Sequence, residues 1–325
     1  MQASYDITVI LCTYNRAELL GGALNSLTTQ QTDNEFTYEV LVVDNGSTDE
    51  TQQVVRELAT QHQLSIRVVS EAKPGLSAAR NCGIREAQGD WLAFFDDDEL
   101  ADPRWLYELH ALAQEKECRV VGGAVRLVLT EDQQQEVSPY LERLLAPGGR
   151  QQSACRFTLK NALNGGNAMV HHRVFQEVGL YDEDWTEGGE DTDWFWRLQT
   201  AGVEAWFTPR AVVRHLVPGY RLLPAYLRWV SLRQGWSTAR QDGDRRGKAA
   251  AAFLALLRLA KGGLVHYPLL CWATAADNRL FRQCQLWRVQ GYLRNAFRQL
   301  APRLFPQRDF DRWIEFRGER QQFSQ

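Results

Sequence analysis

The chain has 325 residues, of which 44% are hydrophobic and 24% are charged. This length suits one large α/β domain with an appendage, or two domains, and the composition argues against long disordered segments. The six cysteines are scattered and form no C-x-x-C pair, so we expect reduced thiols of a cytosolic protein rather than a zinc knuckle or a disulfide framework. The first residues do not resemble a signal peptide, and we expect no export.

The net charge of −3 conceals an acidic and a basic part of the chain. Residues 1–219 contain 18 Lys and Arg against 33 Asp and Glu, whereas residues 220–325 contain 19 against 7. The differences of these counts are −15 and +12. A division of this size predicts two domains with different tasks, with a boundary near residue 219.

The acidic part alternates strands with helices, and each expected strand leads into a polar loop. The expected strands are residues 7–11, 38–43, 66–69 and 89–95. Asn15 and Glu18 stand at capping-box spacing before the first helix. The strands are continuously apolar and lie between helices, which indicates a mostly parallel sheet covered on both faces. The sequence therefore predicts an α/β fold.

Ligands of such sheets bind outside the carboxyl ends of the strands. Polar residues follow all four strands and should therefore gather at one edge of the sheet, at positions 13–16, 44–45, 73–81 and 96–99. The first turn has no G-x-G-x-x-G sequence, which argues against a nicotinamide or flavin enzyme, and the chain has no G-x-x-x-x-G-K-[ST] sequence of a P-loop.

Four consecutive acidic residues, Asp96 to Glu99, follow the fourth strand. Like charges at such short distances repel one another, so the cluster is costly unless a cation lies on it. Oxygen ligands suit Mg²⁺ or Mn²⁺, and Mg²⁺ is usually held by one or two carboxylates together with substrate phosphates. The cluster therefore predicts a metal and a phosphorylated ligand. A solvated acidic turn is the alternative.

Seven segments of the acidic part occur in an order typical of one enzyme family. They are residues 9–16, 39–49, 79–83, 96–98, 165–170, 187–194 and 212–215. In these segments the chain resembles the family 2 glycosyltransferases of the GT-A fold, which have a Rossmann-like, mostly parallel sheet. The resemblance implies an inverting transfer from a nucleoside-diphosphate sugar, with a UDP-sugar as the expected donor. The acceptor would be a glycan or lipid-linked hydroxyl in cell-surface or exopolysaccharide synthesis.

The resemblance also assigns donor-binding roles to single residues. Asp44 would contact the nucleoside, Arg80 would lie near the base or diphosphate, and Asp96 would lie near the ribose. The residues implied in binding the nucleotide-sugar are Thr13, Asn15, Arg16, Asp44, Asn45, Arg80, Asp96, Asp97 and Glu190.

Asp98 and His215 would be the ligands of Mg²⁺ or Mn²⁺, and Asp191 would be the catalytic base. The chemistry agrees with these roles, because a metal stabilises the charge that develops on the departing diphosphate. Inversion in one displacement also needs one carboxylate to take the proton of the acceptor hydroxyl on the opposite face of the sugar.

Structural interpretations remain open for these residues. Asp191 could be one of the acids that favour a helix N-terminus, and His215 could be an ordinary core or surface histidine. Glu190 and Asp193 could assist the base or simply cap the helix. The nearby tryptophans could stack on acceptor sugars or fill the core; they are Trp185, Trp194 and Trp196.

The basic part should be helical over about 222–240, 246–261 and 264–300, with breaks at Gly262-Gly263 and Pro302. Its apolar stretches are interrupted by charged residues and prolines, so we predict no transmembrane helix. Arginines interleaved with tryptophans favour helices that lie on an anionic membrane surface, on the cytoplasmic face, or that pack on the acidic part. No nucleic-acid-binding motif accompanies the charge, and we expect no nucleic-acid partner.

Two other functions deserve comparison with sugar transfer. A sugar-phosphate nucleotidyltransferase would need a Gly-rich, basic loop after the first strand, which residues 12–16 do not provide. A non-catalytic sugar- or membrane-binding member of the fold would not need Asp191 and the whole acid cluster. The Q-x-x-R-W sequence of processive synthases is also incomplete at residues 225–229, where the glutamine is missing, so we expect transfer of single sugars.

Overall fold

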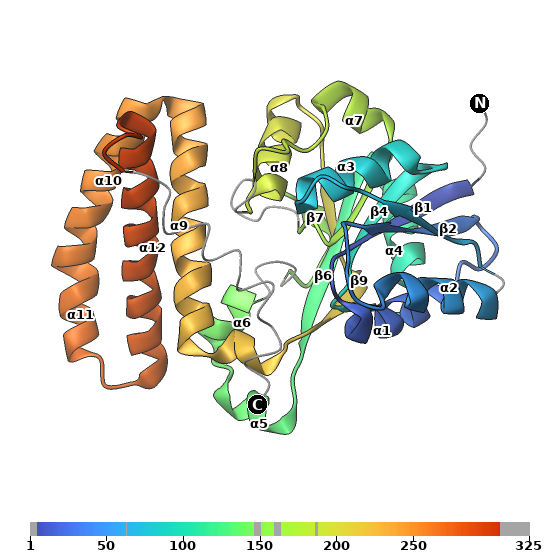
Figure 1. Ribbon diagram of the computed structural model, residues 1–325, viewed down its shortest axis with the longest axis horizontal. Helices are drawn as coiled ribbons and strands as arrows, with labels where there is room; N and C mark the ends of the chain where they lie inside the picture. Colours follow the sequence, from blue (N-terminus) through green and yellow to red (C-terminus); the bar gives the residue numbers. More distant parts are fainter. Residues whose placement is uncertain (1–4, 63, 146–150, 159–163, 186–187, 306–325) are drawn as a thin grey trace. The chain divides into compact units, whose positions relative to one another are not determined.

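The computed structural model describes residues 5–62, 64–145, 151–158, 164–185 and 188–305 (Figure 1). These residues form two compact units. The α/β unit consists of the described residues within 1–129, 142–186 and 190–217, and the helical unit consists of those within 130–141, 187–189 and 218–325. The main division therefore falls between Val217 and Pro218.

Parallel strands form one half of the nine-stranded sheet of the α/β unit. The strands are β1 (Tyr5–Thr13), β2 (Tyr38–Asp44), β3 (Ile66–Ser70) and β4 (Gly89–Asp96). They lie in the order β3-β2-β1-β4, and every neighbouring pair is parallel. The parallel arrangement expected for these four strands is thus confirmed.

The other half of the sheet is mixed. Beyond β4 the order continues β8-β6-β9-β5, and β7 pairs with β9. The strands are β5 (Glu99–Ala101), β6 (Val120–Val128), β7 (Cys155–Arg156), β8 (Asn167–His171) and β9 (Trp206–Leu216). β6 and β9 are parallel, whereas β4–β8, β6–β8, β5–β9 and β7–β9 are antiparallel. This half was not resolved into strands by the sequence pattern.

Helices cover both faces of the sheet, as the continuously apolar strands predict (Figure 1). Successive residues of β1 point to opposite faces, so Val9 and Leu11 belong to one buried cluster and Ile10 to the other. The helices of the first face are α1 (Ala17–Thr28), α2 (Thr51–Gln61) and α4 (Trp105–Glu115). Those of the second face are α3 (Leu76–Glu86), α7 (Arg173–Val178) and α8 (Glu190–Thr200).

The helical unit contains three long helices and several short ones. They are α5 (Glu131–Glu136), a 3₁₀ turn (Gly219–Leu222), α9 (Pro224–Arg246), α10 (Lys248–Lys261), a π-helical turn (Gly262–His266), α11 (Tyr267–Trp272) and α12 (Ala276–Leu300). The short helix α6 (Pro139–Leu145) follows α5 in the chain.

The expected break at Gly262-Gly263 is wrong. Gly262 has helical backbone angles, and the chain continues through the π-helical turn into α11. Pro268 is tolerated because it lies in the first turn of α11. The chain leaves the helix only at Ala273, whose backbone is extended.

The apolar stretches of this part therefore join into one longer helical run, while the prediction that it contains no transmembrane helix stays a prediction. Lys248–Trp272 is a helical run of 25 residues, long and apolar enough to cross a membrane, although length and composition are the only criteria it meets. A run divided at Gly262 and Gly263 gives two short apolar stretches instead of one long one.

Gly83 brings α3 close to the sheet. A Cβ atom at this position would lie 2.4 Å from Ile10 Cγ2 and 3.3 Å from Val43 Cγ2. Since α3 also carries Arg80, this contact fixes the distance between that side chain and the strand ends.

Gly83→Ala should lower the free energy of unfolding by about 1–3 kcal/mol, because α3 would have to move off the sheet to admit the methyl group. Chemical denaturation measures the change. Gly21→Ala is the control, since a Cβ in the middle of α1 meets no heavy atom within 4 Å. It should raise the stability by about 0.5–1 kcal/mol. Wild-type stability of Gly83→Ala would contradict the close contact.

Candidate active site

The carboxyl ends of the parallel strands bring the predicted residues to one edge of the sheet. Thr13 at the end of β1 is paired in register with Asp44 at the end of β2, and Cys12 is paired with Asp96 at the end of β4. The polar loops therefore lie next to one another, as the order of strands and helices predicts.

Thr13, Arg16 and His215 surround the acidic residues that follow β4. Thr13 Oγ1 donates a 2.9 Å hydrogen bond to Asp97 Oδ2. Arg16 Nη2 lies 3.7 Å from Asp98 Oδ2, and His215 Nε2 lies 3.7 Å from the same oxygen. His215 reaches this position because β5 and β9 are antiparallel and pair Glu99 with His215.

Burial makes negative charge costly in this cluster. It raises the pKa of Asp97 to about 7, and the neighbouring Asp98 adds to the rise while Arg16 opposes it. Burial also raises the pKa of Asp96 and, much further, that of Glu99. Among the described residues no group donates a hydrogen bond to Glu99 Oε2. The cluster therefore favours additional positive charge.

Arg80 is the buried cation on the other side of the acid cluster. Its Nη1 lies 3.1 Å from Glu190 Oε1, and its Nη2 lies 3.6 Å from Asp96 Oδ1. The guanidinium carbon stands 5.5 Å from the centre of the Tyr181 ring. Arg80 thus connects the end of β4 with the start of α8.

Two glycines before β8 allow these side chains to come together. A Cβ at Gly166 would lie 2.3 Å from Asp96 Oδ2, and one at Gly165 would lie 3.0 Å from both Arg80 Nη atoms and 3.1 Å from Asp191 Cβ. Neither glycine was predicted to have a role in the site. The pair of glycines directly before a strand was the signal that the backbone approaches other groups closely.

Asp191 and Glu190 differ in their surroundings at the start of α8. Glu190 is buried against Arg80, whereas Asp191 Oδ1 accepts a 2.7 Å hydrogen bond from Thr192 N and one of 3.3 Å from Thr192 Oγ1. Burial and the charge of Glu190 raise the pKa of Asp191, while Arg80 lowers it. A carboxylate with a raised pKa is a better proton acceptor near neutral pH than an ordinary one.

The structure gives Asp44 and Asn45 contacts within their own loops. Asp44 accepts hydrogen bonds from Ser47 N at 2.9 Å and from Gln52 Nε2 at 2.6 Å. Asn45 Nδ2 donates to the carbonyl oxygens of residues 71 and 73, and its Oδ1 accepts from Gly75 N at 2.8 Å. Asn45 therefore shapes the loop that leads into α3.

Asn15 does not cap the first helix, contrary to the capping-box expectation. Its backbone is left-handed, with φ of +48°, and its Oδ1 accepts a 2.7 Å hydrogen bond from Thr48 N. Arg16 takes the cap position without a side-chain hydrogen bond. The side chain of Asn15 is thus used to join the loops after β1 and β2. Direct contacts of Asn15, Asp44 and Asn45 with a nucleotide stay predictions.

Asp193 and Trp194 of α8 make contacts that stabilise the fold. Asp193 Oδ2 lies 3.0 Å from Arg197 Nε, and Arg197 also donates to the carbonyl oxygens of residues 178 and 180. Trp194 is buried and packs on Phe175 with ring centres 5.0 Å apart. Trp194 is therefore part of the core.

Among the described residues, no group of three or more His, Cys, Asp or Glu side chains is arranged to hold a metal ion. Asp98 and His215 form a two-ligand set, with the candidate atoms 3.7 Å apart. Bonds of about 2.0–2.2 Å place the ligands of one ion about 3–4 Å from each other. The two residues therefore fit one Mg²⁺ or Mn²⁺ ion that takes its remaining ligands from a substrate or water.

Comparisons with known proteins show the family of the chain. The family model for glycosyl transferase family 2 matches residues 8–179. The succinoglycan biosynthesis protein ExoM of Rhizobium meliloti is 28% identical over 281 residues, which cover 85% of this chain and 88% of ExoM. The glycosyltransferase AglE of Haloferax volcanii is 30% identical over 64% of this chain and 66% of its own length.

Solved structures show the same fold. The mannosyltransferase PcManGT from Pyrobaculum calidifontis, in complex with GDP-Man and Mn²⁺, has a TM-score of 0.62 at 20% identity and covers 92% of this chain and 88% of its own. TarS residues 1–349 from S. aureus, in complex with UDP, has a TM-score of 0.52 at 16% identity and covers 90% of each chain.

The chain is a glycosyltransferase with a GT-A-like α/β fold and a C-terminal helical extension. It belongs to glycosyl transferase family 2, because the family model matches more than half of its residues. The predicted family and fold are confirmed.

Gly166→Ala should weaken binding of a nucleoside diphosphate by about tenfold or more, because the added methyl group would displace Asp96 and with it Arg80. Calorimetry with UDP and GDP in the presence of Mn²⁺ measures the affinity. Gly22→Ala is the control, since its added Cβ meets Leu100 at an ordinary 3.5 Å. Unchanged affinity in Gly166→Ala would show that the position of Asp96 does not matter for the nucleotide.

Proposed function

We propose that this glycosyltransferase is inverting and depends on a divalent metal. It moves one sugar from a nucleoside-diphosphate sugar to a hydroxyl of a glycan or lipid-linked acceptor in polysaccharide synthesis. One observation carries the proposal. Asp98 and His215 lie close together on one side of the acid cluster, and Arg80 and Asp191 lie on its other side. The biosynthetic relative named for succinoglycan supports the polysaccharide product.

Asp98 and His215 are the proposed ligands of Mg²⁺ or Mn²⁺. Their carboxylate and imidazole donors suit these ions, and the consecutive acidic residues Asp96 to Glu99 surround them with further negative charge. When bound, the ion stabilises the negative charge that develops on the leaving diphosphate. The Mn²⁺ in the PcManGT complex is in keeping with this assignment.

Arg80 and Asp191 perform the remaining steps. Arg80, held by Glu190 and Asp96, supplies fixed positive charge beside the diphosphate, and it needs no reorganisation during the reaction. Asp191 takes the proton of the acceptor hydroxyl as the bond to the anomeric carbon forms. Glu190 serves Arg80 and is the less suitable base, since loss of its charge would release a buried cation.

A UDP-sugar is the proposed donor, and the reaction is proposed to take place at the cytoplasmic face of a membrane, with the enzyme bound peripherally. Bound nucleotides in the two solved neighbours are GDP-Man and UDP. A thermal-shift panel of both diphosphates and their sugars identifies the donor, because a ligand at about 100 times its Kd adds about 2.7 kcal/mol of stability.

Asp98→Asn should abolish the effect of Mn²⁺ on UDP affinity, because the variant loses a charged ligand, and His215→Ala should reduce this effect less. Calorimetry with and without Mn²⁺ measures both. Asp90→Asn is a matched control, since Asp90 lies at the opposite end of β4 beside His172. Equal UDP affinity of the wild type with and without Mn²⁺ would refute the metal site.

Asp191→Asn should lower turnover by about 10²–10⁴-fold while UDP affinity stays the same, because an amide keeps the shape of the side chain but cannot accept the proton. Since the pKa of Asp191 is raised, wild-type turnover should fall on acidification at a pH above the usual range of aspartate. Asp193→Asn, which changes an acid two residues away, is the matched control and should keep near-normal turnover. Normal turnover in Asp191→Asn would remove it as the base.

A further inference from the structure

The helical run Lys248–Trp272 buries small residues and exposes large apolar ones. Its buried stripe consists of Ala251, Ala255, Gly262 and His266, together with Ala252. On the side opposite this stripe, at helical spacing, lie Phe253, Leu256, Leu257, Leu264 and Tyr267, all of them exposed. Leu264 is 80% exposed, and Trp272 at the end of the run is 82% exposed. We call the side formed by Phe253, Leu256, Leu257, Leu264, Tyr267 and Trp272 the apolar face.

One buried cluster of the helical unit also consists largely of small residues. It contains Ala239, Ala251, Ala255 and Ala296 around Tyr292. The large side chains of the apolar face lie outside this cluster.

Glycines allow the backbones of α9 and α12 to approach each other closely. A Cβ at Gly235 would lie 2.0 Å from the carbonyl oxygen of Arg288, and one at Gly291 would lie 2.0 Å from that of Leu232. Contacts between helices through small residues, with large apolar side chains outside, are typical of helices in an apolar medium. An exposed apolar patch of this kind marks an interaction surface.

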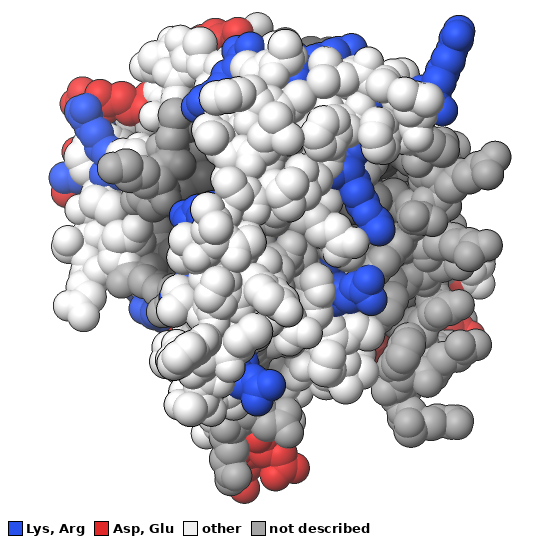
Figure 2. Space-filling model, turned by 90° about the vertical axis from the view of Figure 1, so that its left-hand side faces the viewer, with Lys and Arg blue, Asp and Glu red and all other residues white. Residues whose placement is uncertain are grey.

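The charge around the apolar face favours an anionic partner. Residues 245–305 contain 11 Lys and Arg and a single acidic residue, Asp277. In Figure 2 the side that carries α10 and α11 is a broad white surface with separate blue side chains, and red side chains lie near the margins of the view. Apolar side chains bordered by basic ones match the acyl chains and head groups of an anionic bilayer.

The charges within the run favour a helix that lies in the membrane surface over one that spans the bilayer. Arg258 and Lys261 stand near the middle of the 25 residues and would be placed in the bilayer centre if the run crossed it. Arg258 instead turns to the protein, where its guanidinium lies 4.2 Å from the centre of the Tyr292 ring and 3.6 Å from Asp242 Oδ2.

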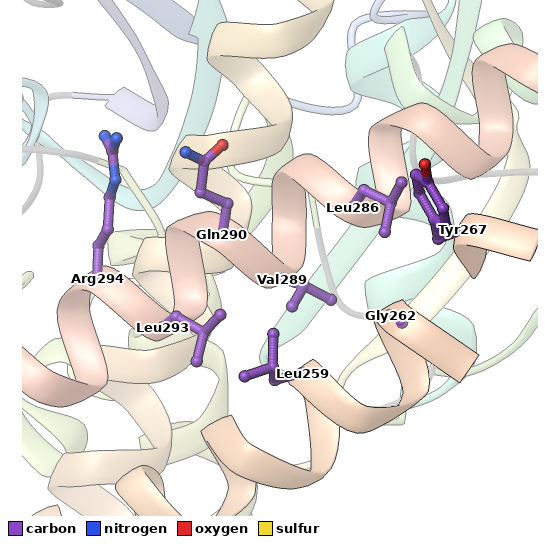
Figure 3. Close-up of a pocket in the computed structure, with 9 residues that line it drawn as sticks. Leu259, Gly262, Tyr267, Leu286, Val289, Gln290, Leu293 and Arg294 are labelled. Carbon is purple, nitrogen blue, oxygen red and sulfur yellow. The ribbon is translucent and has the colours of Figure 1, made fainter. Parts of the chain in front are cut away.

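An apolar groove continues the face between the run and α12. It has a volume of about 430 Å³. In Figure 3, Leu259 of α10 points toward Val289 and Leu293 of α12 across the gap, whereas Gln290 and Arg294 point away from it. Side chains leave this space unfilled, so it can accept part of an acyl chain while Arg294 remains at the head-group level.

We propose that the apolar face of Lys248–Trp272 inserts in the plane of an anionic phospholipid membrane. Leu256, Leu257, Leu264 and Trp272 enter the acyl region, and the surrounding arginines and lysines bind the head groups. The inference specifies the surface that holds the enzyme at the membrane and rests on the proposed peripheral location, but not on the proposed reaction. It differs from binding by charge alone, because the apolar side chains supply most of the affinity.

Vesicle flotation with the full chain tests the proposal. Wild type should float with vesicles of phosphatidylcholine and phosphatidylglycerol, should bind phosphatidylcholine vesicles more weakly, and should keep most of its binding at high salt. The double variant Leu256→Glu with Leu264→Glu should lose about tenfold or more in affinity, because burial of even one leucine corresponds to about a factor of ten. Val68→Glu with Val128→Glu is the matched control, since both valines are exposed and lie in the α/β unit.

Several outcomes would overturn the proposal. One is unchanged flotation of the Leu256/Leu264 double variant, and another is an equal loss in the valine control. Resistance of the bound protein to an alkaline carbonate wash would show a spanning helix. A dimer of wild type that separates in the double variant, without vesicle binding, would show that the face joins two copies of the chain. The double variant should keep the UDP-dependent thermal shift of the wild type. This control shows that the variant is folded, and it separates a failure of the proposed donor binding from a failure of membrane binding.

Discussion

The α/β unit depends on negative charge that is buried at the carboxyl edge of its sheet. Asp96, Asp97 and Asp98 leave β4 together, and two arginines approach them from different elements. Arg80 also neutralises Glu190, so the arginines offset only part of the acidic charge. Burial raises the pKa of Asp97, and the charge of Asp98 adds to the rise while Arg16 opposes it. At the proposed metal site, the acidic charge that remains would couple binding of the metal to binding of the phosphates that complete its coordination.

Close backbone contacts hold these charges at fixed distances. Gly83 lets α3, which carries Arg80, pack closely on β1. Gly166, before β8, leaves space for the side chain of Asp96. Asn15 and Asn45 hold the loops on the other side through hydrogen bonds to the backbone. Because these contacts are made by small or amide side chains, the charged groups are positioned before any ligand arrives. Such preorganisation is what stabilises a developing charge in a transition state.

The first four strands and the polar loops at the edge of the sheet could be predicted from the sequence, because parallel strands and their loops are local patterns. The roles of single residues in these loops came from the resemblance to a known family. The pairing of Glu99 with His215 could not be derived from local patterns, since it depends on an antiparallel strand far along the chain. The resemblance to a known family supplied His215 instead. The division of Lys248–Trp272 into two helices failed for another reason. Glycine lowers helix propensity, but Gly262 is buried where tertiary contact outweighs that preference.

The two units differ in where they place their large apolar side chains. In the α/β unit the large apolar side chains are inside, and the polar groups gather where strands end. In the helical unit alanines and glycines lie at the helix contacts, and Leu264 and Trp272 face outward. Water alone would favour the first arrangement for both units, because exposure of large apolar side chains is unfavourable there. The second arrangement is favourable if lipid replaces water on one side. Each unit is therefore suited to a different environment: the α/β unit to water and the helical unit, in the proposed membrane-bound state, to the surface of a bilayer.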